Sequence, residues 1–319
     1  MNNPANDQLN ENNDHEVDLL EIFKSLNQGK WIIVSMTAFF SIIGVIYSLL
    51  LPNIYSSEAI LAPASSSGGI SGALKGYGGL ASLAGINIPS NSDNNSTQAI
   101  KKLSSLSFFE NNVLPYIFLP DLMAVKSWNS QDNTLTYDDS IYKESTNTWV
   151  QGNSIANKQM PSAQDGFKVF IEEHLSVSED RKTGFVTLQI KHQSPFVARQ
   201  WAELMINQIN AFYRQKDKFE SEKSVNYLNQ QIVISSLQEV KVAFADLIQE
   251  ETKKLTLIEA KNSYVFEYVD PPAVMERKSE PWRLLIVILS ALIGGILSII
   301  FVLVKAFVLK EKASYALRH

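Results

Sequence analysis

Apolar residues are unevenly distributed along this chain, and two long uncharged segments stand out. Trp31 to Leu51 (WIIVSMTAFFSIIGVIYSLLL) and Leu284 to Val304 (LLIVILSALIGGILSIIFVLV) each contain twenty-one residues without a charge. A helix of that length spans about 31 Å, the thickness of the hydrocarbon core of a bilayer. A helix of a soluble protein rarely stays apolar on every face for so long. The pattern therefore predicts transmembrane helices at residues 31–51 and 282–304.

These two spans divide the chain into a short N-terminal segment (residues 1–30), a large central domain (52–281) and a short tail (305–319). Basic residues before the first span and after the second, such as Lys30, Lys305 and Lys310, favour cytoplasmic termini. The central domain is then periplasmic, and the protein is a multi-pass protein of a bacterial inner membrane. The first span is too long for a cleavable signal peptide and has no A-x-A site directly after it, which indicates an uncleaved anchor.

Within the central domain, three segments have the pattern of strands. Residues 55–62 and 264–269 alternate or are rich in aromatic and β-branched residues, and residues 185–191 (FVTLQIK) alternate apolar and polar positions. The first and last of these lie just outside the two spans, so we expect them to pair. Residues 126–164 are polar and are expected to form an irregular excursion. Residues 64–95 are rich in Gly, Ser and Asn, which predicts either a flexible loop or a loop with a short helical piece.

The segment from Pro195 to about Lys261 contains no further Pro and no Gly, and its apolar residues recur every three or four positions. Ser194 and Pro195 are a typical helix start. We predict a long helix over about residues 195–261, as one rod of up to about 100 Å or as two consecutive helices. Its apolar stripe needs a cover from this chain or from other copies, and Val240, Phe244 and Leu247 are candidate contacts. The predicted fold class is α+β, with a small mixed sheet, the long helix and two flanking spans.

Composition and motifs give no chemistry for an active site. The net charge of −5 argues against nucleic acid, and the absence of cysteine removes disulfides and thiolate sites. The histidines show no metal-ligand spacing, and the Gly-rich tract lacks the GxxxxGK[ST] phosphate loop. No nucleophile motif occurs. We therefore expect no enzymatic activity, no cofactor and no metal.

The spans carry small residues at intervals of four, a spacing that lets two helices approach closely, although small residues are also simply common in spans. Gly29, just before the first span, is expected to be a flexible joint. The candidate residues for packing between transmembrane helices are Gly44, Ser48, Ser290, Ala291, Gly294, Gly295 and Ser298.

Four stretches together resemble the Wzz-type chain-length determinants, also called polysaccharide co-polymerases. They are VDLLEIFKSLNQGKWIIV before and into the first span, YSSEAILAP after it, the long helix after QIKHQSP, and DPPAVMERKSEP followed by IGGILS. The resemblance covers essentially the whole chain. It marks Pro271, Pro272, Ser279 and Pro281 as the family's proline-rich segment.

The resemblance implies a periplasmic α+β base, a long projecting helix and a ring of protomers, about eight copies, held by heterologous contacts. It implies a regulator of the modal length of O-antigen or a related polysaccharide, which acts with a Wzy-type polymerase on lipid-linked chains and has no enzymatic activity. A component of a capsule or exopolysaccharide export machine has a similar architecture and stays open. A two-span sensory receptor is disfavoured, because the cytoplasmic parts are too short for an output domain.

Overall fold

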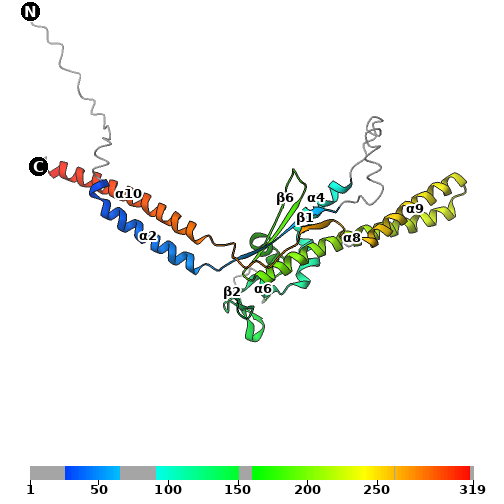
Figure 1. Ribbon diagram of the computed structural model, residues 1–319, viewed down its shortest axis with the longest axis horizontal. Helices are drawn as coiled ribbons and strands as arrows, with labels where there is room; N and C mark the ends of the chain where they lie inside the picture. Colours follow the sequence, from blue (N-terminus) through cyan, green and yellow to red (C-terminus); the bar gives the residue numbers. More distant parts are fainter. Residues whose placement is uncertain (1–25, 65–90, 151–159, 262, 317–319) are drawn as a thin grey trace, which may run out of the picture. The chain divides into compact units, whose positions relative to one another are not determined.

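The computed structural model describes residues 26–64, 91–150, 160–261 and 263–316 (Figure 1). The chain separates into two compact units. One comprises Met1–Leu51 and Pro281–His319, and the other comprises Pro52–Glu280. Each unit is described by itself below. Most of the Gly-rich tract, residues 65–90, lies outside the described ranges, so the alternatives for that tract stay predictions.

The first unit is a pair of long apolar helices, α2 (Lys30–Leu50) and α10 (Arg283–Ala316). Both contain a stretch that is long and apolar enough to cross a membrane, Lys30–Leu50 and Arg283–Ala306. The helices pack antiparallel, because Gly29 lies against Val302 and Gly44 lies against Ser290. Large apolar side chains such as Leu50 and Leu284 point outward and are exposed, which is the arrangement that lipid favours and water disfavours.

The second unit is built on a four-stranded sheet in the order β6-β7-β1-β8. All three pairings are antiparallel, so the expected mixed sheet was wrong on this point. The strand that arrives from the first span and the strand that returns to the second must run in opposite directions, which makes their pairing antiparallel. The predicted pairing of these two strands is confirmed by the register Leu61↔Tyr268. The strands are β1 (Tyr55–Pro63), β6 (Leu175–Glu179), β7 (Val186–His192) and β8 (Phe266–Asp270).

One face of this sheet is buried under the first half of α8 (Pro195–Ile234). The alternation in β7 places Val186, Leu188 and Ile190 in the core, as its sequence pattern predicts. Helix α8 contributes residues such as Met205 and Ile209 to the same core. It begins where the Ser194 side chain accepts a hydrogen bond from the Val197 amide, with Pro195 at the first helical position.

Of the two alternatives for residues 195–261, the structure has two consecutive helices and not one rod. Helix α8 ends at Ile234, and α9 (Gln238–Ala260) folds back alongside it (Figure 1). Ser235 and Leu237 have extended backbone angles, with ψ of 133° and 126°, and this reverses the chain. No Gly or Pro marks the break. Two amphipathic helices that fold on each other each cover part of the partner's apolar stripe, which a single rod cannot do.

Shorter elements cover the rest of the second unit. Two small hairpins, β2–β3 and β4–β5, occupy much of residues 126–164, so the irregular excursion expected there contains regular structure. These elements are α4 (Asn91–Leu103), α5 (Leu106–Phe108), the π-helix η1 (Phe109–Val113), the 3-10 helix η2 (Leu114–Tyr116), α6 (Leu119–Met123), β2 (Val125–Asn129), β3 (Thr134–Tyr137), β4 (Tyr142–Lys143), the 3-10 helix η3 (Glu144–Thr146), β5 (Thr148–Trp149), α7 (Ala163–Val169) and the π-helix η4 (Phe170–His174).

Candidate functional site

The interface between α2 and α10 depends on glycine at two of the candidate positions. A Cβ atom added to Gly44 would lie 2.6 Å from Cβ of Ser290, and one added to Gly294 would lie 2.6 Å from Cβ of Phe40. Both distances are far below van der Waals contact. The two backbones therefore approach to a distance that only glycine permits at these positions.

The other small residues of the spans are not equivalent to these two. Gly295 has room for a side chain, because its nearest neighbour would be Oγ1 of Thr37 at 3.9 Å from an added Cβ. Ser48 and Ser298 are buried on the shared face, whereas Ser290 and Ala291 are half-buried. The hydroxyl of Ser298 donates to the Gly295 carbonyl at 2.7 Å, which satisfies it within its own helix.

Gly29 also belongs to this interface, a role that the sequence reading missed. It is the N-cap of α2, and an added Cβ would lie 2.5 Å from Cγ1 of Val302. The expectation of a flexible joint was wrong, because Gly29 is buried and packed. The signal was present in the spacing: Gly29, Ile33, Thr37, Gly44 and Ser48 fall near one helical face.

The proline-rich segment runs beside the start of β1. The amides of Ser279 and Glu280 donate to the Ile54 carbonyl at 2.8 and 3.2 Å, and the Ile54 amide donates to the Glu280 carbonyl at 3.0 Å. The Ser279 hydroxyl adds a bond of 3.0 Å to the Ile54 carbonyl. Of the four residues singled out from the sequence, Pro272 is buried, Pro271 is exposed, and Ser279 and Pro281 are half-buried. This segment therefore fastens the returning chain to the first strand.

The α8–α9 hairpin places the three candidate contact residues differently. Val240 and Phe244 are half-buried, whereas Leu247 is 46% exposed. Several large apolar side chains on the hairpin are exposed as well, which leaves apolar positions for another molecule to cover. The most exposed of them are Phe219, Tyr227, Val233, Ile234 and Leu237.

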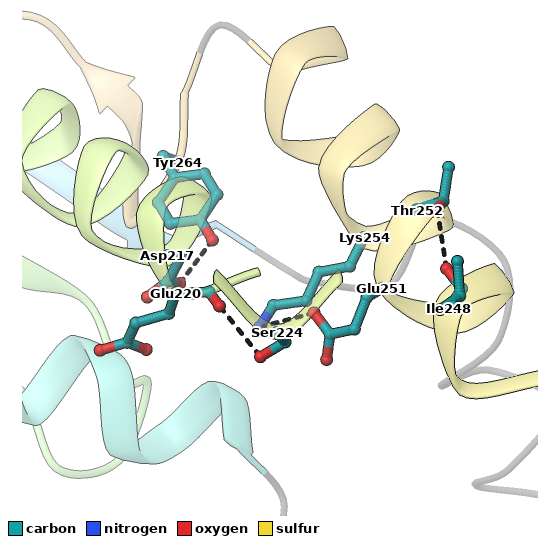
Figure 2. A network of polar contacts seen from close by, with 8 residues as sticks. All are labelled: Asp217, Glu220, Ser224, Ile248, Glu251, Thr252, Lys254 and Tyr264. Atoms are coloured by element: carbon teal, nitrogen blue, oxygen red, sulfur yellow. Dashed lines mark hydrogen bonds and ion pairs between the residues drawn. The ribbon is translucent and has the colours of Figure 1, made fainter. Parts of the chain in front are cut away.

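Polar contacts fix the root of the hairpin. Figure 2 shows the Tyr264 hydroxyl donating to Oδ2 of Asp217, at 2.5 Å, and this bond links the segment before β8 to α8. The guanidinium of Arg214 donates to the Lys261 carbonyl at 2.6 Å, and Lys218 forms an ion pair with Glu259. Burial and the hydrogen bond to Asp217 raise the pKa of Tyr264 far above its usual value, so this phenol stays a donor at any physiological pH.

Asn210 on α8 is the most heavily bonded side chain at this root. Its Oδ1 accepts from the amides of Tyr264, Val265 and Phe266 at 3.3, 2.8 and 2.9 Å, and its Nδ2 donates to the Phe266 carbonyl at 3.0 Å. The side chain is buried. It therefore satisfies the backbone of the incoming β8 strand where no other strand covers it.

Two histidines from different elements, His174 and His192, lie next to each other against Trp201 of α8. The rings of His174 and His192 stack at 5.6 Å, and both pack edge-on against Trp201. His192 donates through Nε2 to the Asp121 carbonyl at 2.9 Å and accepts from the Ser194 amide at Nδ1. His174 has both ring nitrogens at carbonyl oxygens, 2.6 Å from Lys191 and 3.2 Å from Leu122. Their nitrogens are thus committed to the protein backbone and not to a metal.

Burial sets the protonation of this pair. It lowers the pKa of His192 to about 4 and also lowers the pKa of His174, although the two carbonyls at His174 oppose the shift. In the part of the chain that the structure describes, no group of three metal-binding side chains comes together. His15 and His319 lie outside the described residues.

The architecture defines a two-span, membrane-anchored class of protein: two apolar helices from the ends of the chain pack on each other, and one α+β unit lies between them in sequence. Residues 15–112 match the family model described as "Wzz: Chain length determinant protein". The match confirms the resemblance found in the sequence: this segment, which includes α2 and β1, is similar to the chain-length determinants. A comparison with curated protein sequences found no match.

Among solved structures, the chain is similar to the following three at low identity. A full-length bacterial polysaccharide co-polymerase is 14% identical, with 92% of this chain and 98% of that chain covered and a TM-score of 0.36. A fragment of WzzB from Salmonella Typhimurium is 14% identical, with 72% and 100% covered and a TM-score of 0.30. A mutant of the Shigella flexneri lipopolysaccharide O-antigen chain-length regulator is 11% identical, with 71% and 100% covered and a TM-score of 0.26.

Proposed function

We propose that this chain is a non-enzymatic regulator of the modal length of O-antigen or a related surface polysaccharide. The observation that carries the proposal is the match of residues 15–112 to the chain-length determinant family, a segment that includes α2 and β1. In this proposal the protein acts with a Wzy-type polymerase on lipid-linked chains. It supplies a surface and a geometry, and the polymerase supplies the chemistry.

The proposed location is the bacterial inner membrane, with α2 and α10 as spans and Pro52–Glu280 in the periplasm. Support comes from the outward-facing apolar side chains of both helices and from the basic residues beyond their terminal ends. The proposed assembly is a ring of copies of this chain, and the apolar positions left exposed on the α8–α9 hairpin support it.

Deletion of the gene tests the function, with cell-surface polysaccharide separated on a gel. We expect the modal band to disappear while polymer of unregulated length remains, and the wild-type gene on a plasmid to restore the band. Loss of all surface polymer would instead indicate a role in export and would contradict length regulation. An unchanged ladder would contradict both roles.

Reporter fusions test the orientation. A reporter that is active only in the periplasm should be active after Ser140, which lies between the two spans in sequence, and inactive after His319. The matched control is a reporter that is active only in the cytoplasm, fused at the same two positions, which should give the opposite pattern. If Ser140 reports from the cytoplasm, the proposed orientation is wrong.

A further inference from the structure

The starting point is the end of the sheet at which the chain arrives from α2. Tyr55 is the first residue of β1 and stands four residues after Leu51, a path of at most about 13 Å at the reach of an extended chain. The neighbouring Ile54 is bridged to Glu280, which stands three residues before the start of α10. Both connections to the apolar helices thus leave the second unit at one point.

Three aromatic side chains gather beside this point, and we name them the aromatic collar: Tyr55, Trp128 and Phe196. The rings of Tyr55 and Trp128 meet edge-on at 5.3 Å, and the rings of Trp128 and Phe196 lie 6.2 Å apart. The register Tyr55↔His192 explains the gathering, because it brings the end of β7 and the start of α8 to the first residue of β1.

The collar is not part of the core. Phe196 is 47% exposed, and Tyr55 and Trp128 are only half-buried. The one polar atom of the Trp128 ring, Nε1, donates to Oδ1 of Asn133 at 2.9 Å. The ring system therefore presents apolar surface to its surroundings with its hydrogen-bonding edge already satisfied.

One cationic side chain lies on a segment of the collar, and another lies on the segment that returns to α10. Lys126, two residues before Trp128, is exposed, and Arg277, three residues before the Ile54–Glu280 bridge, is exposed as well. The carboxylate of Glu280 at the bridge is neutralised by Lys191, 2.5 Å away. Aromatic rings with nearby Lys and Arg are the combination found at membrane interfaces, where rings sit at headgroup depth and cations meet lipid phosphates.

We propose that the aromatic collar is a lipid-facing anchor that inserts into the headgroup region of the bilayer. The occupant of this surface is phospholipid, because Tyr55 stands four residues after Leu51, its neighbour Ile54 is bridged to Glu280 three residues before α10, and Lys126, two residues from Trp128, is exposed. This proposal rests on the assignment of α2 and α10 as membrane spans. Its consequence is mechanical: the sheet is held to the membrane surface by rings as well as by the covalent chain.

Spin labelling of the full-length protein in nanodiscs of phosphatidylethanolamine and phosphatidylglycerol tests the collar. The chain has no cysteine, so each single-cysteine variant carries one label. Lys126→Cys reports on the collar. Lys253→Cys, exposed on α9, is the aqueous control, and Leu49→Cys, exposed on α2, is the lipid control. Collisions of each label with oxygen, which concentrates in lipid, and with a water-soluble nickel chelate measure its depth.

We expect the label at position 126 to shift towards oxygen relative to position 253. A label at 126 as open to the nickel chelate as that at 253 would overturn the proposal. Poor access to both reagents would overturn it too, because that result indicates burial against another copy. The lipid control distinguishes failure of the collar proposal from failure of the span assignment. If the label at position 49 also behaves as aqueous, the assignment of α2 as a membrane span is wrong.

Substitution of the rings supplies the second arm. In the Lys126→Cys background, Trp128→Ser with Phe196→Ser should shift the label towards the nickel chelate. Tyr227→Ser, which removes a ring of similar exposure from the hairpin, should leave the label unchanged. Circular dichroism confirms that the variants remain folded. Equal effects of the two substitutions, or no effect of the collar substitution, would contradict the anchor.

Discussion

This chain contains two antiparallel helix pairs, α2–α10 and α8–α9, that are held together by different kinds of contact. In α2–α10 the closest contacts are those of glycines with Ser290, Val302 and Phe40, and many other large apolar side chains point outward. In α8–α9 the contact is reinforced at its root by the Lys218–Glu259 ion pair and by the bond from Arg214 to the Lys261 carbonyl, and several apolar side chains stay exposed. The difference shows how the solvent decides the design. In lipid, moving a leucine from the surface into a helix contact gains little free energy, so close backbone packing must hold the helices together. In water, burial of apolar surface is favourable, and charged side chains can stay exposed.

The connections differ as well. Helices α8 and α9 are joined by three residues, so the hairpin can form locally. Helices α2 and α10 are separated in sequence by the whole second unit. Their pairing therefore relies on the close contacts of their glycines, and the Ile54–Glu280 bridge holds the two connecting segments together. Four substitutions or conditions test this contrast.

The largest effect is expected at the root of the hairpin. Asn210→Leu removes the acceptor for three amides, two of them buried, and should lower the free energy of unfolding by about 4 kcal/mol, since each buried amide without a partner costs about 1–3 kcal/mol. Chemical unfolding of the full-length protein in detergent, followed by tryptophan fluorescence, measures the loss. Asn207→Leu, an exposed position on the same helix, is the control and should change little. Equal stability of the two variants would show that Asn210 does not secure β8.

The next effect is a pH dependence under α8. The unfolded chain takes up a proton on His192 near its ordinary pKa of 6.5, whereas burial keeps the folded side chain neutral down to about pH 4. The unfolded state thus binds more protons in this interval, so stability falls as the pH drops from about 7 to 4, by up to about 3 kcal/mol for this residue. His174, whose pKa is also lowered, acts in the same direction. The contacts named for α2–α10 carry no ionisable group.

Unfolding curves at pH 7.5 and 5 measure this loss. His192→Gln keeps a donor towards the Asp121 carbonyl and cannot take up a proton, so its stability should depend less on pH. Dependence as steep as that of the wild type would assign the effect to other groups.

A smaller effect is expected between the spans. Gly294→Ala places a methyl group 2.6 Å from Cβ of Phe40 and should destabilise the helix pair by about 1–3 kcal/mol, the usual cost of overpacking. Gly295→Ala adds a methyl group where there is room for it and should change the stability of the helix pair little. The sequence gives no reason to expect different effects at these adjacent glycines. Denaturation by SDS in mixed micelles compares the two variants, and the polysaccharide ladder of cells that express them shows whether the packing matters for length. A similar loss in both would mean that the helices do not pack as described.

Sequence reasoning reached the parts of this molecule that depend on local pattern. The spans follow from uninterrupted apolar runs, and the pairing of β1 with β8 follows from their places beside those spans. The break between the two helices after Ile234 could not be located from the sequence, because no Gly or Pro marks it. Contacts between the helices stabilise the reversal instead. The stacked histidines were missed for a similar reason: His174 ends a π-helix and His192 ends a strand, and only the β6–β7 pairing brings them together. The place of Gly29 on the same helical face as Gly44 and Ser48 could be found from the sequence, whereas its contact with Val302 could not.

The smallest effect on folding, and the most informative for assembly, is expected at Leu247. Its side chain is 46% exposed, so Leu247→Asp should cost the isolated chain about 0.5 kcal/mol or less. If copies of the chain cover the hairpin, the same change places a charge in an apolar contact and should lower the particle mass in detergent, as measured by light scattering. Phe244→Asp is a poorer test, because Phe244 is half-buried within its own hairpin and its loss confounds folding with assembly. Lys253→Asp, also exposed on α9, controls for added negative charge. An unmutated protein that is monomeric after gentle extraction would contradict the ring, and an unchanged mass for Leu247→Asp would place the contacts elsewhere on the hairpin.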